Sequence, residues 1–305
     1  MSKFSLTILG SSGAVPAFGR FPTSQYLVVQ NRHFLIDAGE GVQMQLQRFQ
    51  IPIHKIDCIF ISHLHGDHYL GLMGLLFSMH LQRRVNDLHL YSQSGLDEII
   101  LVQLKHSKSV LNYQIHFHAF DPTEPVLIYE DKALTVETIP LLHKLPCAGF
   151  LIREKTKAVN LNKNKLIPGM LIQHIVQLKL GADVFDAKGD LLYRNSDFTL
   201  PSPPSYSYAF CSDTAFNKNM IEQIRSVTLL YHEATFMEEE KDKAHETKHS
   251  TAKEAATTAK LGAAQKLIVG HFSARYRDLE PLLNEAREIF SNTFLAEEGN
   301  TFEIP

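Results

Sequence analysis

The feature that most constrains this chain is a cluster of four potential metal ligands within six residues. The segment His63-Leu64-His65-Gly66-Asp67-His68 directly follows an apolar run at residues 59–62 that is typical of a buried strand. Side chains two residues apart in extended backbone point the same way, so the first two histidines can hold one ion. After a turn at the glycine, Asp67 and His68 open the next helix and can face a second ion. A polar loop of hydrogen-bonded histidines is the plainer alternative, but four such side chains so close together favour a metal site.

The alternation of short apolar runs with turn residues predicts an α/β chain. Strands are expected at residues 4–9, 25–30, 33–36, 57–62, 133–139, 148–153, 206–210, 227–231 and 266–269. Apolar residues at helical spacing predict helices at residues 39–49, 69–81, 217–225, 251–262 and 279–290. Two β-rich halves, each with its own helices, favour two sheets packed face to face with helices outside.

Charge and cysteine content exclude several classes of protein. The 30 basic and 33 acidic residues give a net charge of −3, which excludes a histone-like nucleic-acid binder. The sequence has no apolar run of 18 residues, so we expect no transmembrane helix and no membrane partner. The N-terminal stretch lacks the charged region and cleavage site of a secretion signal. Three cysteines without a CxxC pair favour a reducing, cytoplasmic setting.

The charge is unevenly distributed along the chain. Residues 151–181 contain six basic residues and one acidic residue, a local charge of +5, so the remainder carries −8. A lysine-rich stretch is usually a solvated loop, but lysines can also contact phosphates and so position a nucleic acid without reading its sequence. The residues by themselves leave both interpretations open.

The metal-ligand segment resembles the signature of the metallo-β-lactamase superfamily, whose fold is an αββα sandwich. That superfamily takes further ligands from the ends of later strands, and this chain has suitable residues there: His143, Asp213 and His271. The resemblance implies two metals bridged by Asp213, the first on His63, His65 and His143 and the second on Asp67, His68 and His271.

Further motifs are similar to one family within this superfamily, ribonuclease Z. They are LGSSGAVP at 9–16, IDAGEG at 36–41, HEATF at 232–236, HST at 249–251 and HFSARY at 271–276. The resemblance implies a single αββα domain at 1–305 with an inserted tRNA-binding arm at 151–195. It also implies zinc-dependent endonucleolytic removal of the 3′ trailer from precursor tRNA by a homodimer. The tRNA would keep a 3′-hydroxyl, and the trailer a 5′-phosphate.

The same resemblance implies roles for individual side chains. Asp67 accepts the proton of the attacking water, and Glu233 orients His249, which supplies a proton to the leaving 3′ oxygen. Arg275 offsets charge on the phosphoryl oxygens. The arm contacts RNA through Lys155, Lys157, Lys163 and Lys165. The plainer alternatives are a structural hydrogen bond for Glu233 and His249, and a surface ion pair for Arg275. The expected cofactors are two Zn²⁺ ions per subunit, although Mn²⁺ or Fe²⁺ also suit a His/Asp site.

Other functions fit the sequence less well. The same fold hosts phosphodiesterases that act on other RNAs or on small phosphodiesters, and the fold alone does not decide between them. A non-catalytic RNA-binding protein is disfavoured because every expected ligand is present. A β-lactamase-like hydrolase or a thioesterase has no need of the basic insert or of the HEAT and HST segments.

Overall fold

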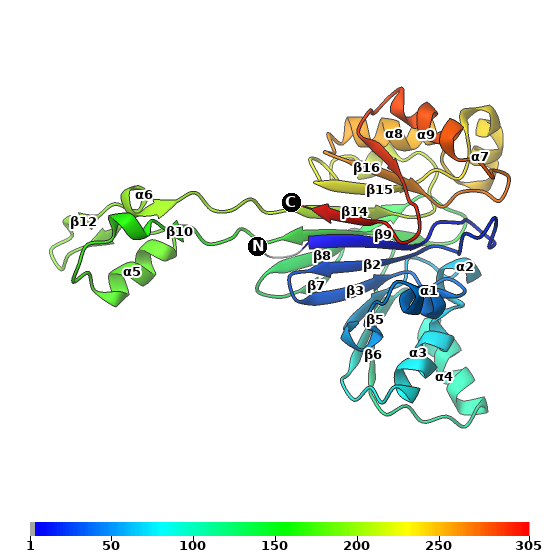
Figure 1. The fold of residues 1–305 in the computed structure, drawn as a ribbon, viewed down its shortest axis with the longest axis horizontal. Helices are drawn as coiled ribbons and strands as arrows, with labels where there is room; N and C mark the ends of the chain where they lie inside the picture. Colours follow the sequence, from blue (N-terminus) through cyan, green and yellow to red (C-terminus); the bar gives the residue numbers. More distant parts are fainter. Residues whose placement is uncertain (1–3, 305) are drawn as a thin grey trace. The chain divides into compact units, whose positions relative to one another are not determined.

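The computed structural model describes residues 4–304, and its framework is a pair of seven-stranded sheets (Figure 1). The first sheet has the order β18-β1-β2-β3-β4-β5-β6. Its strands are β1 (Phe4–Gly10), β2 (Ser24–Val29), β3 (Arg32–Ile36), β4 (Cys58–Phe60), β5 (Leu88–Ser92), β6 (Ile115–Ala119) and β18 (Thr301–Ile304). Strands β3 to β6 run parallel to one another, whereas the pairs β18–β1, β1–β2 and β2–β3 are antiparallel.

The second sheet has the order β17-β16-β15-β14-β9-β8-β7. Its strands are β7 (Leu127–Glu130), β8 (Leu134–Leu141), β9 (Cys147–Glu154), β14 (Ser207–Cys211), β15 (Leu229–Glu233), β16 (Leu267–Gly270) and β17 (Thr293–Leu295). Strands β14 to β17 are parallel, so their carboxyl ends meet at one edge of the sheet.

Helices cover the outer face of each sheet (Figure 1). On the first sheet they bury an aliphatic core that includes Leu46, Leu76 and Ile100. These helices are α1 (Val42–Arg48), α2 (Gly66–Tyr69), α3 (Leu72–Leu81) and α4 (Leu96–His106). On the second half of the sandwich lie α7 (Lys241–Thr247), α8 (Ala252–Leu261) and α9 (Glu280–Arg287). The predicted αββα sandwich is therefore confirmed.

A row of aromatic rings fills the space between the two sheets. The ring centroids of Phe60 on β4 and Phe150 on β9 are 5.4 Å apart, so this contact joins the sheets. Phe210 and Tyr231 continue the row, with centroids 5.1 Å apart. The sandwich is thus held by large apolar side chains that alternate with outward-facing residues along each strand.

Two predicted helices differ from the structure. The helix expected at 69–81 is split into α2 and α3 because the Gly71 amide donates to the Ala38 carbonyl, 2.9 Å away, rather than to its own helix. The helix expected at 217–225 is only a 3₁₀ turn at Lys218–Met220. The Asn217 side chain there accepts a hydrogen bond from the Asn219 amide at 3.0 Å, which competes with helix formation.

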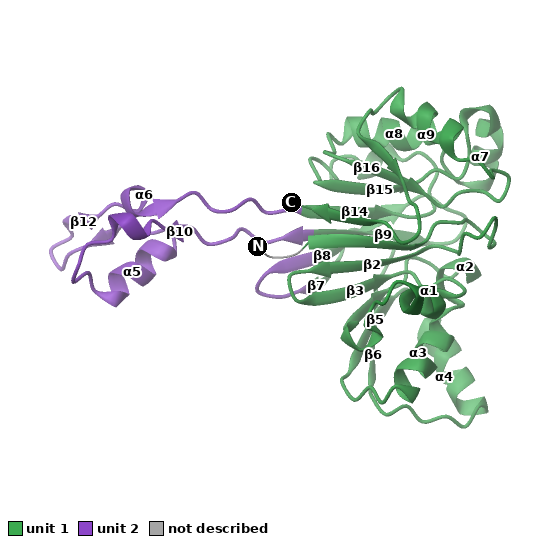
Figure 2. Cartoon of the chain, viewed as in Figure 1, with its two compact units in different colours: residues 1–129, 136–152, 207–305 green, residues 130–135, 153–206 purple. Residues whose placement is uncertain are grey.

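Residues 130–135 and 153–206 form a second compact unit, called unit 2, and the rest of the chain forms unit 1 (Figure 2). The basic stretch lies in unit 2 and has regular structure. The elements between β9 and β14 are β10 (Asn160–Leu161), a 3₁₀ helix (Lys163–Lys165), α5 (Ile172–Lys179), β11 (Val184–Phe185), β12 (Leu191–Tyr193), α6 (Asn195–Phe198) and β13 (Thr199–Leu200). Within the described range, no helix has the length and apolarity that a membrane crossing requires.

Candidate metal centre

The predicted ligands come from loops that follow strands of both sheets. His63, His65, Asp67 and His68 follow β4, and His143 follows β8. Asp213 and His271 follow β14 and β16. Residues far apart in the sequence meet here because the carboxyl ends of the parallel strands lie at the same edge of each sheet.

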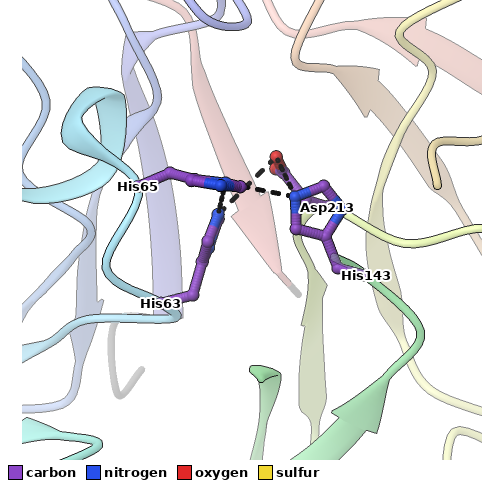
Figure 3. A group of neighbouring side chains, drawn as sticks. All are labelled: His63, His65, His143 and Asp213. Carbon is purple, nitrogen blue, oxygen red and sulfur yellow. Dashed lines mark hydrogen bonds and ion pairs between the residues drawn. The ribbon is translucent and has the colours of Figure 1, made fainter. Parts of the chain in front are cut away.

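The first group consists of His63, His65 and His143, with Asp213 beside them (Figure 3). The Nδ1 atom of His65 lies 2.9 Å from His63 Nε2 and 3.2 Å from His143 Nε2. Nitrogens that share a tetrahedral zinc at about 2.05 Å lie about 3.3 Å apart. The three rings therefore have the spacing that one metal ion requires.

The second group consists of Asp67, His68 and His271. The Nε2 atoms of His68 and His271 lie 3.4 Å and 3.5 Å from Asp67 Oδ2. The Asp213 carboxylate divides between the groups. Its Oδ1 lies 3.3 Å from His68 Nε2 and 3.2 Å from His271 Nε2. Its Oδ2 lies 3.8 Å and 3.7 Å from the Nε2 atoms of His63 and His143 in the first group.

The chemistry of these side chains fits metal ions. The Nε2 atoms of His68 and His271 are buried and have no hydrogen-bond partner among the described residues. Burial lowers the pKa of His63, His65 and His143, which favours the neutral imidazole that binds metals. Burial would raise the pKa of Asp67 and Asp213, but the surrounding histidines outweigh it and hold the pKa of both carboxyls well below its usual range.

Hydrogen bonds to the outer ring nitrogens fix the orientation of several ligands. Asp37 Oδ2 accepts a bond from His68 Nδ1 at 2.7 Å, and Asp37 Oδ1 accepts one from the Ser62 amide at 2.8 Å. His143 Nδ1 donates to the Lys248 carbonyl at 2.9 Å, and Thr235 Oγ1 lies 2.8 Å from His271 Nδ1. Such contacts select the tautomer that leaves Nε2 for a metal.

We expect Asp37→Asn to weaken metal binding about 10- to 100-fold, because His68 loses the buried carboxylate that orients it. Competition against a chelator of known affinity measures the change. Asp87→Asn is the matched control. Asp87 is exposed and precedes the amino end of β5, whereas the candidate metal centre lies at the carboxyl ends of the strands. Equal metal affinity of the two variants would contradict this role of Asp37.

His249 and Glu233 form a close pair beside the second group. Glu233 is fully buried, and its Oε1 lies 2.8 Å from His249 Nδ1. Burial lowers the pKa of His249, but the Glu233 carboxylate outweighs it and raises the pKa to about 9. The carboxylate therefore favours the protonated form of the imidazole. One of its ring nitrogens lies within 4.8 Å of ligand atoms of Asp213 and His271.

Members of both groups and His249 line one cleft with a volume of about 480 Å³. Its wall is formed by Ala14, Glu40, His65, Gly66, Asp67, Leu70, His143, Lys144, Asp213, Thr247, His249 and His271. The Ala14 amide donates to Asp67 Oδ2 at 2.8 Å, so the N-terminal loop also supports a predicted ligand.

The predicted RNA-binding residues are not part of this cleft. Arg275 is exposed and its Nη1 lies 2.7 Å from Glu240 Oε1, an arrangement that matches the ion-pair alternative. In unit 2, Lys155 Nζ lies 2.6 Å from Glu130 Oε1, and Lys157 Nζ lies 2.7 Å from Glu154 Oε2. Lys163 and Lys165 are exposed. Within residues 4–304, neither of these two lysines has an ion pair.

Sequence reasoning missed the residues that support the ligands. Asp37 and Glu40 lie in the IDAGEG segment, but only the fold brings Asp37 to His68 and Glu40 to the cleft wall. Thr235 lies in the HEAT segment, and likewise only the fold brings its hydroxyl to His271. Lys144 lies next to a predicted ligand, and that adjacency is the one signal that could have singled it out.

Comparison with known proteins assigns the chain to a family. It is 46% identical over 301 residues to a protein of Cytophaga hutchinsonii named Ribonuclease Z, a match that covers 99% of this chain and 96% of the relative. A Bacteroides thetaiotaomicron protein of the same name is 43% identical, with 100% and 96% covered. The chain belongs to the ribonuclease Z family. Residues 4–165 also match the family model described as "Anti-Pycsar protein Apyc1", and the chain is a member of the family which that model describes.

Solved structures agree with membership of the ribonuclease Z family. The short form of human tRNase Z is 25% identical, with a TM-score of 0.72 and 99% of each chain covered. The metallo-β-lactamase fold protein YhfI of Bacillus subtilis has a TM-score of 0.69 at 18% identity, and covers 99% of this chain and 100% of its own. This second likeness confirms the fold alone.

Proposed function

We propose that this protein is a metal-dependent endoribonuclease that removes the 3′ trailer from precursor tRNA. The observation that carries the proposal is one cleft that joins two ligand groups, bridged by Asp213, with the His249–Glu233 pair. The relatives named Ribonuclease Z, which span the whole chain, support the same activity. The products are a tRNA with a 3′-hydroxyl and a trailer with a 5′-phosphate.

The cofactors in this proposal are two Zn²⁺ ions, and Mn²⁺ or Fe²⁺ also suit the ligand types. One ion would be held by His63, His65 and His143, the other by Asp67, His68 and His271, and Asp213 would contact both. Two metal ions in such a site supply an activated water and stabilise the attacking and leaving oxygens of an in-line displacement.

The side chains of the cleft complete the reaction. Asp67 lies at the second group and accepts the proton of the attacking water. His249 donates its proton to the leaving 3′ oxygen of the tRNA, because Glu233 holds the imidazolium in place and raises its pKa. Glu233 is a positioning residue, since it contacts His249 and the Thr214 amide at 2.8 Å each.

Binding of tRNA is the proposed role of unit 2, which extends the arm expected at 151–195. Residues 153–206 contain eight basic and five acidic side chains, and the basic ones gather in the first half of the segment. Lys163 and Lys165 have no ion pair within the described part of the chain, so they are better placed for phosphates than Lys155 and Lys157. We also propose that the protein acts as a homodimer in the cytoplasm.

Cleavage of a precursor tRNA with mapping of both new ends tests this function. We expect a single cut at the start of the trailer, complete loss of cleavage in a chelator, and recovery when Zn²⁺ or Mn²⁺ is added. Unchanged cleavage in the chelator would contradict the metal-dependent mechanism. Hydrolysis of bis(p-nitrophenyl) phosphate without any cleavage of precursor tRNA would favour the rival small-phosphodiester activity.

A further inference from the structure

The cleft contains one basic side chain whose role is unassigned. Among the described residues that line the cleft, Lys144 is the only lysine or arginine. It is exposed, and the described part of the chain provides it with no hydrogen bond or ion pair. Glu246 is a neighbouring acid, but its Oε2 is already 2.8 Å from Lys243 Nζ. The ammonium group of Lys144 is therefore available to a ligand in the cleft.

Lys144 lies on the part of the wall that holds His249. Its neighbour His143 bonds the Lys248 carbonyl, and the ring centroids of His143 and His249 are 5.0 Å apart. The acidic wall residue Glu40 belongs to a different part, beside Asp67, because a Cβ atom on its neighbour Gly39 would lie only 2.5 Å from the Asp67 carbonyl oxygen. The two parts of the wall therefore carry opposite charge, so a phosphate group is bound more favourably beside Lys144 than beside Glu40.

The chemistry of the cut orients the RNA relative to these walls. The proposed reaction leaves a 3′-hydroxyl on the tRNA, so the ribose that carries the leaving oxygen must lie at His249. The next phosphate on the tRNA side then lies on the wall that Lys144 shares with His249. The trailer leaves towards the wall around Asp67 and Glu40.

We propose that Lys144 binds the phosphate immediately 5′ of the scissile phosphate, on the tRNA side of the cut. This inference rests on the proposed function. It gives Lys144 the substrate-anchoring role in the cleft that the sequence had suggested for Arg275, whose guanidinium is paired with Glu240. A lysine suits this contact because a mobile point charge holds a phosphate without selecting a base.

Steady-state cleavage of precursor tRNA by Lys144→Ala tests the inference. We expect KM to rise about tenfold while kcat stays within about twofold of the wild-type value. The slope of log binding constant against log salt concentration should fall by the amount expected for about one phosphate contact. Competition with products gives the direction of the strand. Mature tRNA should inhibit the variant about tenfold less well, and a 5′-phosphorylated trailer oligonucleotide should inhibit both proteins equally.

Two further variants sharpen the test. Lys144→Arg keeps the charge and should restore KM to within about threefold of the wild-type value. Lys266→Ala removes the same charge at the other end of β16, because Lys266 precedes this strand and His271 follows it. This variant should behave as wild type. If wild-type protein cleaves and Lys144→Ala has an unchanged KM, or loses trailer affinity instead, the inference is overturned and the proposed function stands. A wild-type protein that leaves precursor tRNA uncut overturns both.

Discussion

Asp67→Ala is expected to lower the rate of precursor tRNA cleavage about 10⁴-fold. The carboxylate lies within 3.5 Å of the Nε2 atoms of His68 and His271, so its removal leaves the second ligand group incomplete. It is also the proposed proton acceptor, and loss of general acid–base catalysis alone costs about 10²- to 10⁴-fold. Single-turnover cleavage measures the rate, and elemental analysis should show about half the metal content of the wild type.

Asp87→Ala is the control for the Asp67 variant, because Asp87 is exposed and its carboxylate lies 2.9 Å from His116, outside the candidate metal centre. Thermal unfolding of both variants separates a lost ligand from a lost fold. If Asp67→Ala cleaves at the wild-type rate, the mechanism assigned to Asp67 is wrong. If it loses no metal but is slow, Asp67 acts on protons alone.

Replacement of residues 156–204, which make up most of unit 2, by a tight turn is expected to reduce affinity for precursor tRNA on the order of 100-fold. The chain offers a clean junction, because the Glu154 amide donates to the Tyr206 carbonyl at 3.0 Å where β9 ends and the chain returns to β14. Asn-Gly in place of residues 156–204 gives a two-residue hairpin there. Loss of Lys163, Lys165 and Lys179 should also lower the slope of log binding constant against log salt concentration by the amount expected for about two to three phosphate contacts.

The hairpin variant keeps every residue of the candidate metal centre, so we expect it to hydrolyse bis(p-nitrophenyl) phosphate within about twofold of the wild-type rate. The double substitution Lys163→Gln, Lys165→Gln is the milder counterpart that retains the rest of unit 2. Equal loss of tRNA cleavage and small-ester hydrolysis would contradict a separate RNA-binding role. Equal tRNA affinity with and without unit 2 would contradict it as well.

The sequence predicted the fold where local patterns decide the structure. Strands such as β2 and β15 are short apolar runs between turn residues. Helix α8 begins directly after its N-cap Thr251, whose side chain forms a capping box with Glu254. The split between α2 and α3 was not predictable from spacing. A side chain on Gly71 would place its Cβ 2.0 Å from the Gly39 carbonyl oxygen, so the break depends on a distant loop.

The candidate site divides in the same way. His63, His65, Asp67 and His68 are close in sequence, so their pattern indicated a metal site before any fold was known. His143, Asp213 and His271 are isolated residues, and only the family resemblance selected them among 16 histidines and the many acids. The role of Asp37 was not predictable from the sequence, because its contact with His68 joins two loops that are 31 residues apart. Arg275 carried the right charge, but no local pattern could show that Glu240 pairs with it.

The position of unit 2 between β9 and β14 has a consequence for how the second sheet assembles. These two strands are neighbours in the sheet, yet about 50 residues separate them, and closing such a loop costs conformational entropy. Within unit 2, Asn160 pairs with Leu200 and Leu161 with Thr199. If this pairing forms first, the open loop shrinks to about 14 residues and the closure penalty falls by about 1 kcal/mol. Early pairing inside the insert would therefore offset part of the penalty that the insert imposes on the second sheet, and a chain that forms this pairing late should refold more slowly.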